Sequence, residues 1–165
     1  MNKFFITTPI YYVNDVPHIG HAYTTVAADV LARYWREKLG KKNVFFLAGT
    51  DEHGQKVAQA AKEAGVSPKE YADSVAPRFV DSWKLLNIDY DQFIRTTDPK
   101  HEALVSELIQ KIHDNGYIYK GTYEGLYCVG CEKFLTETEL INGRCPLHPN
   151  KEPNHQKEKN YYLKL

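Results

Sequence analysis

Apolar and polar positions along the first part of the chain predict two strands joined by a helix. Apolar runs at 4–10 and 44–48 predict the strands, and between them apolar residues recur at helical spacing until Gly40. These residues are Ala22, Val26, Ala27, Val30, Leu31 and Tyr34. A helix between two strands predicts a parallel βαβ unit with a right-handed crossover. Both strands then end at the same edge of one sheet, where open α/β folds bind ligands.

The pattern predicts three more helices and then, from about position 116, a change from helices to short strands. It predicts helices over 55–64, from Ser67 to about Leu86 and from Pro99 to Gly116, with a strand over 92–95. Ser67 and Glu70 are spaced as a capping box at the start of the second of these helices. From Tyr117 onward the segments are short, rich in tyrosine and typical of strands. The last stretch, 160–165, is predicted to be a strand with no partner left in the chain.

Composition indicates an ordinary globular protein. The chain has 165 residues, 42% of them hydrophobic, which suits one domain or one domain and part of a second. Its 21 basic and 21 acidic residues give a formal charge of +0, so we expect no DNA partner and no membrane surface. No apolar run approaches the roughly 20 residues of a membrane span. The chain also enters its first strand directly after Lys3, so we expect a cytoplasmic protein.

The three cysteines lie close together and are paired in the sequence with a histidine. Cys128 and Cys131 form one close pair, and Cys145 and His148 form another. This spacing is typical of a tetrahedral Cys₃His zinc site, and Asn142-Gly143 is a hairpin-turn signal that would bring the pairs together. The alternative is three buried free cysteines, which have no reason to be spaced in this way. Because four protein ligands leave no open position, we expect one structural Zn²⁺ per chain.

A second motif, His18-Ile19-Gly20-His21, lies where the first strand gives way to the helix. The two histidines are three residues apart and fall on the same side of the first helical turn. Unpaired N–H groups and the positive end of the helix dipole favour phosphate there. A glycine lets a planar base lie against the backbone. The motif therefore indicates nucleotide binding, although the same residues also suit a plain helix-entry loop.

Together these runs resemble the N-terminal part of the class I aminoacyl-tRNA synthetases, and more narrowly the methionyl-tRNA synthetase family. The resemblance covers essentially the whole chain. It is carried by the runs 7–14, 17–21, 49–54 and 93–97 and by the Cys₃His knuckle. The four-residue histidine signature is shared by the whole class, whereas the stretch before it and the run Gly49-Thr50-Asp51-Glu52-His53-Gly54 are characteristic of the methionine enzymes.

The resemblance implies an α/β fold and an ATP-dependent ligase. Residues 1–115 would form the first half of a Rossmann-like nucleotide-binding domain, and 116–165 part of a connective domain that carries the zinc knuckle. The implied reaction is activation of methionine by ATP, with Mg²⁺, followed by transfer of methionine to tRNA(Met). In that reaction charge builds on the α-phosphate, so the protein must supply preorganised donors there.

The resemblance also implies roles for individual residues. His18 and His21 would be catalytic and would stabilise the ATP phosphates, while Gly20 would let the adenine lie close. Asp51 matches an acidic residue that receives the methionine ammonium group, an opposite-charge recognition.

Two further residues, Ile10 and Tyr12, match positions that line the methionine pocket. Tyr12 can offer its hydroxyl to the thioether sulfur, although either Tyr12 or its neighbour Tyr11 could be a core aromatic. Asp51 also has an alternative role as the N-cap of the helix that begins at Gln55.

The chain departs from the family pattern in one respect. The second class signature, a Lys-Met-Ser-Lys-Ser-type loop that neutralises the departing pyrophosphate, is absent from these 165 residues. We therefore expect a fragment with little activity alone. Two alternatives are a small nucleotidyltransferase with a His-x-Gly-His signature and a non-catalytic, zinc-stabilised tRNA-binding module. Acidic residues nearly cancel the basic ones around the knuckle, which counts against strong independent RNA binding.

Overall fold

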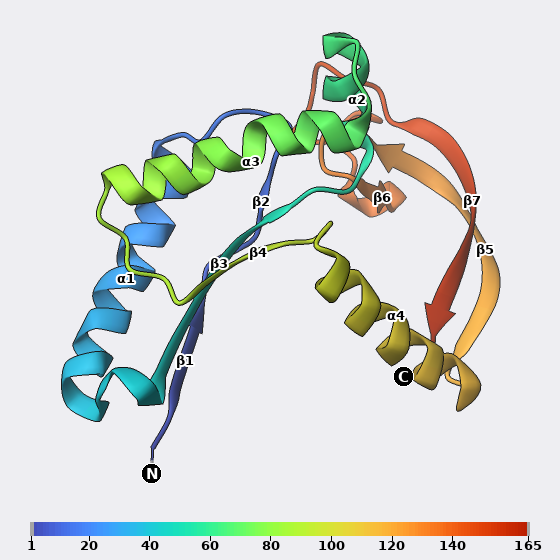
Figure 1. The fold of residues 1–165 in the computed structure, drawn as a ribbon. Helices are drawn as coiled ribbons and strands as arrows, with labels where there is room; N and C mark the ends of the chain where they lie inside the picture. Colours follow the sequence, from blue (N-terminus) through green and yellow to red (C-terminus); the bar gives the residue numbers. More distant parts are fainter. Residues whose placement is uncertain (1, 165) are drawn as a thin grey trace. The chain divides into compact units, whose positions relative to one another are not determined.

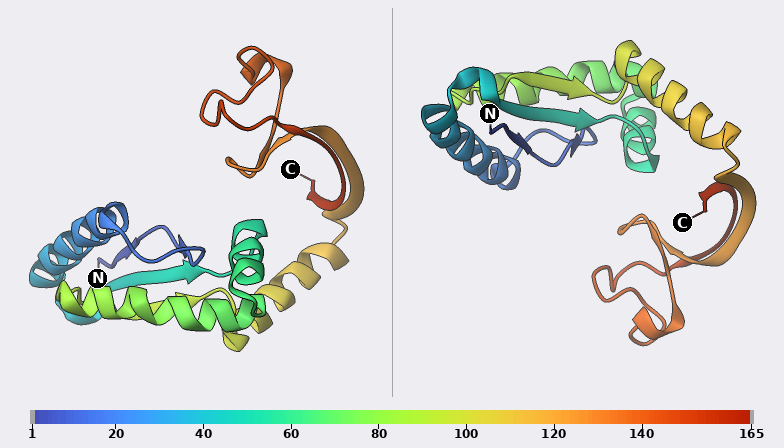
Figure 2. Two further views of the ribbon diagram at one scale, coloured as in Figure 1. Left: turned by 90° about the horizontal axis from the view of Figure 1, so that it is seen from above. Right: turned by 90° about the horizontal axis from the view of Figure 1, so that it is seen from below.

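The computed structural model describes residues 2–164, which fall into two compact units, Met1–Val105 and Ser106–Leu165. The division lies within one helix, α4 (Pro99–Asp114). Figure 1 shows the elements in chain order and Figure 2 shows them from two further sides. The assignment of 1–115 to a catalytic domain and 116–165 to a connective domain stays a prediction.

The first unit is built on a parallel sheet with β3 at its centre. Its strands are β1 (Phe4–Thr7), β2 (Tyr11–Tyr12), β3 (Val44–Asp51) and β4 (Gln92–Arg95). All three neighbours pair with β3 in parallel, with Phe4 opposite Val44 and Tyr12 opposite Asp51. The predicted βαβ unit is thus confirmed. The strand predicted over 4–10 is shorter than expected, because β1 ends at Thr7 and the chain pairs with β3 again only at β2, beyond the predicted range.

Local capping signals explain where the helices begin and end. The helices are α1 (Ile19–Leu39), η1 (Lys41–Asn43), α2 (Gln55–Ala64), α3 (Pro68–Leu85) and α4. Gly40 ends α1 at a φ of 83°, and its N–H donates to the carbonyl of Arg36. Ser67 and Glu70 form the predicted capping box at the start of α3. Over residues 2–164, no helix combines the length and apolar character needed to cross a bilayer.

Helix α1 buries a different face from the one its large apolar residues suggest. Its buried residues are Thr25, Ala28, Asp29 and Ala32. The bulkier Val30, Leu31 and Tyr34 are about half exposed. The apolar spacing therefore predicted the helix correctly, but the face that meets the sheet consists of these small buried residues together with Trp35, whose ring stacks on Phe4 with centroids 5.1 Å apart.

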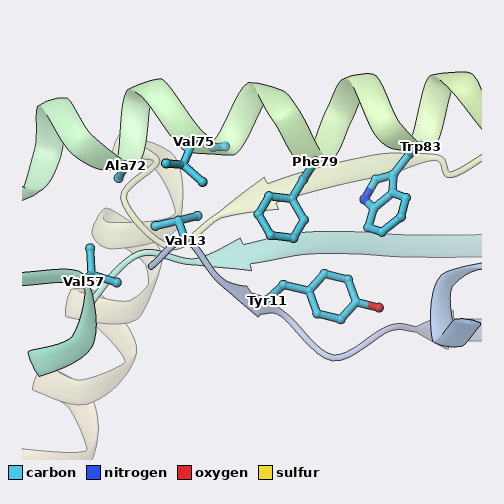
Figure 3. Close-up of a cluster of buried hydrophobic side chains, with 8 residues drawn as sticks. Tyr11, Val13, Val57, Ala72, Val75, Phe79 and Trp83 are labelled. Carbon is cyan, nitrogen blue, oxygen red and sulfur yellow. The ribbon is translucent and has the colours of Figure 1, made fainter. Parts of the chain in front are cut away.

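Helices α1 and α3 lie on the same face of the sheet, so the core of this unit is one-sided (Figure 1). One cluster joins α3 to β2 and is drawn in Figure 3; it comprises Tyr11, Val13, Val57, Ala72, Val75, Ala76, Phe79 and Trp83. A second joins α1 to β1 and β3 and comprises Ala28, Ala32, Val44 and Phe46. Burying each large side chain contributes about 1.5–3 kcal/mol, so these clusters fix both helices on the sheet.

The opposite face of the same sheet leaves two phenylalanine side chains exposed among the described residues of this unit. Side chains alternate along a strand, so Phe5 and Phe45 point away from α1 and α3. Their rings stack with centroids 5.7 Å apart, and Phe5 remains 61% exposed. Parallel sheets are normally covered on both faces, so these two rings mark a part of the sheet that the described residues leave exposed.

The second unit centres on a three-stranded antiparallel sheet. Its elements are β5 (Ile118–Cys128), β6 (Lys133–Leu135), η2 (Glu137–Glu139) and β7 (Asn154–Leu163). Strand β5 pairs with β6 on one edge and with β7 on the other, where ten residues of β7 are in register. The prediction of an unpartnered strand over 160–165 is therefore wrong for residues 160–163, because the long strand β5 offers a second edge. Leu165 lies outside the described residues.

Candidate functional site

The two histidines of the motif form the start of helix α1. His18 is the N-cap residue, and its Nδ1 accepts a hydrogen bond from the N–H of Gly20 at 3.1 Å. His21, at the third helical position, accepts from the N–H of His18 through its own Nδ1 at 3.2 Å. The two imidazole rings stack with centroids 3.7 Å apart. The predicted placement of both histidines on one side of the first turn is confirmed.

The absence of a side chain at Gly20 avoids a close contact within the motif. A Cβ atom at Gly20 would lie 2.9 Å from Cε1 and 3.1 Å from Nδ1 of His18. A side chain there would force the His18 ring to shift from its present position. The glycine therefore permits the cap, whatever else it permits toward a ligand.

Tyr11 ties this helical turn to the core. Its hydroxyl lies 2.6 Å from Oγ1 of Thr24 and 2.8 Å from Oγ1 of Thr25, and it donates to the carbonyl of His21 at 3.3 Å. The Tyr11 ring is buried and lies 4.7 Å from the His21 ring, centroid to centroid. Burial and the neighbouring His18 together lower the pKa of His21 below its ordinary value. Of the two adjacent tyrosines, Tyr11 is thus the core aromatic.

Four of the predicted site residues line one pocket of about 350 Å³ beside the start of α1. Its lining comprises Ile10, Tyr11, Tyr12, Asn14, Asp15, His18 and His21. Sequence reasoning missed Asn14 and Asp15, although Asn14 ends the run 7–14 that carried the family resemblance and Asp15 follows it directly. A larger hollow of about 600 Å³ lies over β4 and the start of α4, and none of the predicted residues lines it.

Asp51 lies next to this pocket rather than in its wall. It is the last residue of β3 and stands opposite Tyr12 in the ladder. Its Oδ1 accepts from the N–H of His53 at 3.3 Å. Helix α2 has Gly54 as its N-cap, with no side-chain hydrogen bond at that end. Asp51 therefore does not cap α2, and its carboxylate remains close to the edge where β2 and β3 end.

The residue after Asp51 anchors this edge of the sheet. Glu52 is buried, and its carboxylate accepts two hydrogen bonds from Arg95 of β4, at 2.6 and 2.8 Å. The hydroxyls of Thr50 and Thr97 also donate to it. Burial raises the pKa of Glu52, but these hydrogen bonds outweigh it and leave the pKa lowered. Sequence reasoning missed this pair because the partners are far apart in the chain.

The second unit brings the predicted metal ligands together. The sulfur atoms of Cys128, Cys131 and Cys145 and a ring nitrogen of His148 all lie within 4.8 Å of one another, and the cysteines are free thiols. Asn142 and Gly143 have φ values of 52° and 75°, and Ile141 bridges Arg144 across them. Two positive φ values identify the type I′ hairpin turn that the sequence predicted.

The distances within this cluster fit a tetrahedron. His148 Nδ1 lies 3.3 Å from the sulfur of Cys131, 3.7 Å from that of Cys128 and 3.9 Å from that of Cys145. The sulfurs of Cys131 and Cys145 lie 3.6 Å apart. With metal–sulfur bonds of about 2.3 Å and metal–nitrogen bonds of about 2.0–2.1 Å, a tetrahedron has S–S edges of about 3.8 Å and N–S edges of about 3.6 Å. A Cβ at Gly130 would lie 2.5 Å from the His148 ring, so a glycine is needed to seat that ligand. The cluster can hold a metal ion.

Comparison with known proteins places these features in one family. The family model described as tRNA synthetases class I (M) matches residues 4–163. A methionine–tRNA ligase of Nostoc sp. is 50% identical over 163 residues, which are 98% of this chain and 30% of that protein. Its counterpart in Thermosynechococcus vestitus is 52% identical with the same coverage. The chain thus spans about a third of the length of these relatives.

A solved structure agrees with the sequence comparisons. The Mycobacterium tuberculosis methionyl-tRNA synthetase in complex with methionyl-adenylate matches this chain with a TM-score of 0.86. The two are 38% identical, and the match covers 99% of this chain and 32% of that one. The α/β fold predicted from the sequence is confirmed.

Proposed function

The chain belongs to the methionine branch of the class I tRNA synthetases, and we propose that it carries the first half of the catalytic domain for ATP-dependent activation of methionine and its transfer to tRNA(Met). The observation that carries the proposal is the shared pocket of Ile10, Tyr12, His18 and His21 at the start of α1. The solved relative with methionyl-adenylate bound supports a ligand that joins methionine to a nucleotide.

Residues at the start of α1 would act on the ATP phosphates. The methionine carboxylate attacks the α-phosphate, a bond forms to phosphorus, and pyrophosphate leaves with its electron pair. Negative charge therefore spreads over the phosphate oxygens. His18 and His21 act as donors toward those oxygens, at the positive end of the α1 helix dipole. Mg²⁺ bound to ATP neutralises part of the same charge.

Residues at the ends of β2 and β3 would bind the methionine. The Asp51 carboxylate pairs with the α-ammonium group, which distinguishes an amino acid from a simple acid. Ile10 and Tyr12, each about 40% exposed in this chain, provide the apolar and hydroxyl surface for the thioether side chain. The register of Tyr12 opposite Asp51 supports this pairing of roles.

We further propose that the metal is one structural Zn²⁺, bound by Cys128, Cys131, Cys145 and His148. Three thiolates and one imidazole are a common zinc set, and a closed set of four leaves no position for a reacting water. The ion would hold the loops between β5 and β7 in place. We also propose a cytoplasmic location, as expected from the sequence.

The nucleotidyltransferase alternative is set aside because the chain belongs to the synthetase family. The chain lacks the second signature loop of the class, so we expect weak substrate binding and little methionine-dependent pyrophosphate exchange by these 165 residues alone.

The proposal is tested by titrating the ¹⁵N-labelled chain with a non-hydrolysable methionyl-adenylate analogue and, as control, with the leucyl analogue. We expect amide signals of 10–21 and 50–53 to shift with the methionyl compound at lower concentration. Signals of the second unit should stay in place. Identical responses to both compounds, or none to either, would contradict the proposal.

In a synthetase that begins with this sequence, His18→Ala or His21→Ala should lower the single-turnover rate of adenylate formation far more than the affinity for methionine. The contact strengthens as phosphate charge develops, so its loss is felt mainly in the transition state. An unchanged rate of adenylate formation in both variants would contradict a role of the motif in the reaction.

A further inference from the structure

The hydrogen bonds at the start of α1 fix which nitrogen of each imidazole carries the proton. The N–H of Gly20 points at Nδ1 of His18, and the N–H of His18 points at Nδ1 of His21. A backbone N–H can only donate, so each Nδ1 must be an unprotonated acceptor. In a neutral imidazole the proton then resides on Nε2.

From this geometry we propose that His18, Gly20 and His21 form a self-capping unit that holds both imidazoles neutral, in the Nε2–H form, as two aligned donors for phosphate. The inference deepens the proposed function, on which its phosphate ligand rests. It changes the expected chemistry, because neutral donors stabilise phosphate charge by hydrogen bonding rather than by ion pairing.

The groups around the imidazole rings of His18 and His21 favour neutral rings over charged ones. The rings stack 3.7 Å apart, a distance at which two imidazolium charges would repel each other strongly. The elements packed against His21 contribute the apolar ring of Phe79 from α3 and the tyrosine ring of Tyr11 from β2. Asp15 is the one acidic residue in the pocket lining. The cluster thus offers little to compensate a second positive charge.

Gly20 has a defined part in this unit. Because a Cβ there would meet the His18 ring at 2.9 Å, a larger residue displaces the ring from the Gly20 N–H. The glycine is therefore a positioning residue that acts through His18. The sequence had suggested only that it makes room for the adenine.

The direct test is long-range ¹H–¹⁵N correlation NMR of the imidazole side chains in the ligand-free 165-residue chain, about one unit above the ordinary histidine pKa. We expect His18 and His21 both to show the Nε2–H pattern. His113 is the internal reference, because its Nδ1 faces the Asp114 carboxylate at 3.3 Å and favours the opposite form. An Nδ1–H pattern or a doubly protonated ring at His18 or His21 would overturn the proposal.

Variants separate capping from donation. His21→Gln keeps a side-chain acceptor for the His18 N–H, as in an ordinary capping box, whereas His21→Leu removes it. Amide exchange at His18 should become about fivefold faster in His21→Leu, which corresponds to the loss of a cap worth about 1 kcal/mol. It should change less than about twofold in His21→Gln. Equal acceleration in both variants would contradict the cap.

Gly20→Ala tests the glycine separately. We expect His18 to lose its Nε2–H preference while His21 keeps it, with the signals of β3 unchanged as evidence of folding. Retention of both forms would show that Gly20 does not act through His18.

Failure of this inference can be told apart from failure of the proposed function, because the proton positions are measured without any ligand. A chain with both Nε2–H forms that does not bind Mg²⁺–ATP contradicts the proposed function alone. A chain that binds Mg²⁺–ATP through cationic histidines should lose affinity as pH rises above their pKa, and that result contradicts this inference alone.

Discussion

Glu52 and Arg95 join the ends of β3 and β4 through two parallel hydrogen bonds of 2.6 and 2.8 Å. The carboxylate is buried, while the guanidinium also reaches Asp73 of α3 at 2.6 Å. Because Glu52 follows Asp51 directly, this pair fixes the backbone that presents Asp51 at the sheet edge. The geometry is the bidentate form that gives such pairs both strength and direction.

Removing Arg95 should be costly because it leaves a buried charge unpaired. We expect Arg95→Met to lower the free energy of unfolding by about 3–5 kcal/mol in urea titrations. Lys69→Met is the control, since it breaks an exposed pair with Asp73 and should cost less than about 1 kcal/mol. The double variant Glu52→Gln with Arg95→Met should recover part of the loss. A small effect of Arg95→Met would show that water reaches Glu52 after all.

The Tyr11 hydroxyl should contribute to stability through the two threonines it contacts. Tyr11→Phe keeps the ring in the core but leaves the hydroxyls of Thr24 and Thr25 without this partner. We expect a loss of about 1 kcal/mol in the free energy of unfolding and faster amide exchange in the first turn of α1. Tyr23→Phe, on the exposed side of the same helix, should change neither quantity.

Asp51→Asn should weaken methionine binding selectively. The substitution keeps size but removes the charge that pairs with the ammonium group, a contact worth roughly 1.5–3 kcal/mol. Methionine affinity should therefore fall about tenfold or more, while ATP affinity should barely change. Isothermal titration with each ligand measures both, and Asp81→Asn controls for the loss of a carboxylate elsewhere. Equal losses for methionine and ATP would reduce Asp51 to a structural residue.

Metal removal should affect one unit of the chain only. Elemental analysis should find one zinc per chain, and chelation should loosen the segment after Tyr127 while the parallel sheet keeps its NMR signals. Cys145→Ser should abolish stoichiometric zinc, whereas His155→Gln, outside the cluster, should retain it. A disulfide among the three cysteines, or pure protein without zinc, would contradict the assignment.

Acidification should destabilise the start of α1. Burial first and His18 second lower the pKa of His21 below 6.5, so the unfolded chain takes up this proton more readily than the folded one. The stabilisation that neutral His21 provides is complete at pH values above the pKa of His21 in the unfolded chain. It is lost as the pH falls from that pKa toward the lower pKa of His21 in the folded chain. Urea unfolding at about pH 7.5 and about pH 5.5 should show the decrease. His21→Gln should show a smaller one, since glutamine does not titrate.

Local signals in the sequence predicted much of this fold. The strand over 92–95 and the helix over 55–64 match the structure residue for residue. The capping box at Ser67 and the Asn142-Gly143 turn were equally readable, because each motif satisfies its own backbone within a few residues.

Features that depend on distant partners were not readable in the same way. The buried face of α1 was not predicted, because Ala28 and Ala32 are only weakly hydrophobic. They are buried because their small side chains contact the sheet. The partner of β7 was missed because nothing within 154–163 indicates which strand offers a free edge. Glu52 and Arg95 looked like two ordinary charged residues, and only the fold shows that burial makes each depend on the other.

The uncovered face around Phe5 and Phe45 has a consequence for synthesis in the cell. The first unit contains its own hydrophobic clusters, so we expect it to begin folding on the ribosome once Val105 has left the exit tunnel. At that moment it would present the stacked rings of Phe5 and Phe45 on the exposed face of its sheet. A nascent chain in this state is a natural client for a holdase chaperone, and its yield on expression should depend on the chaperone supply more than its stability in urea would suggest.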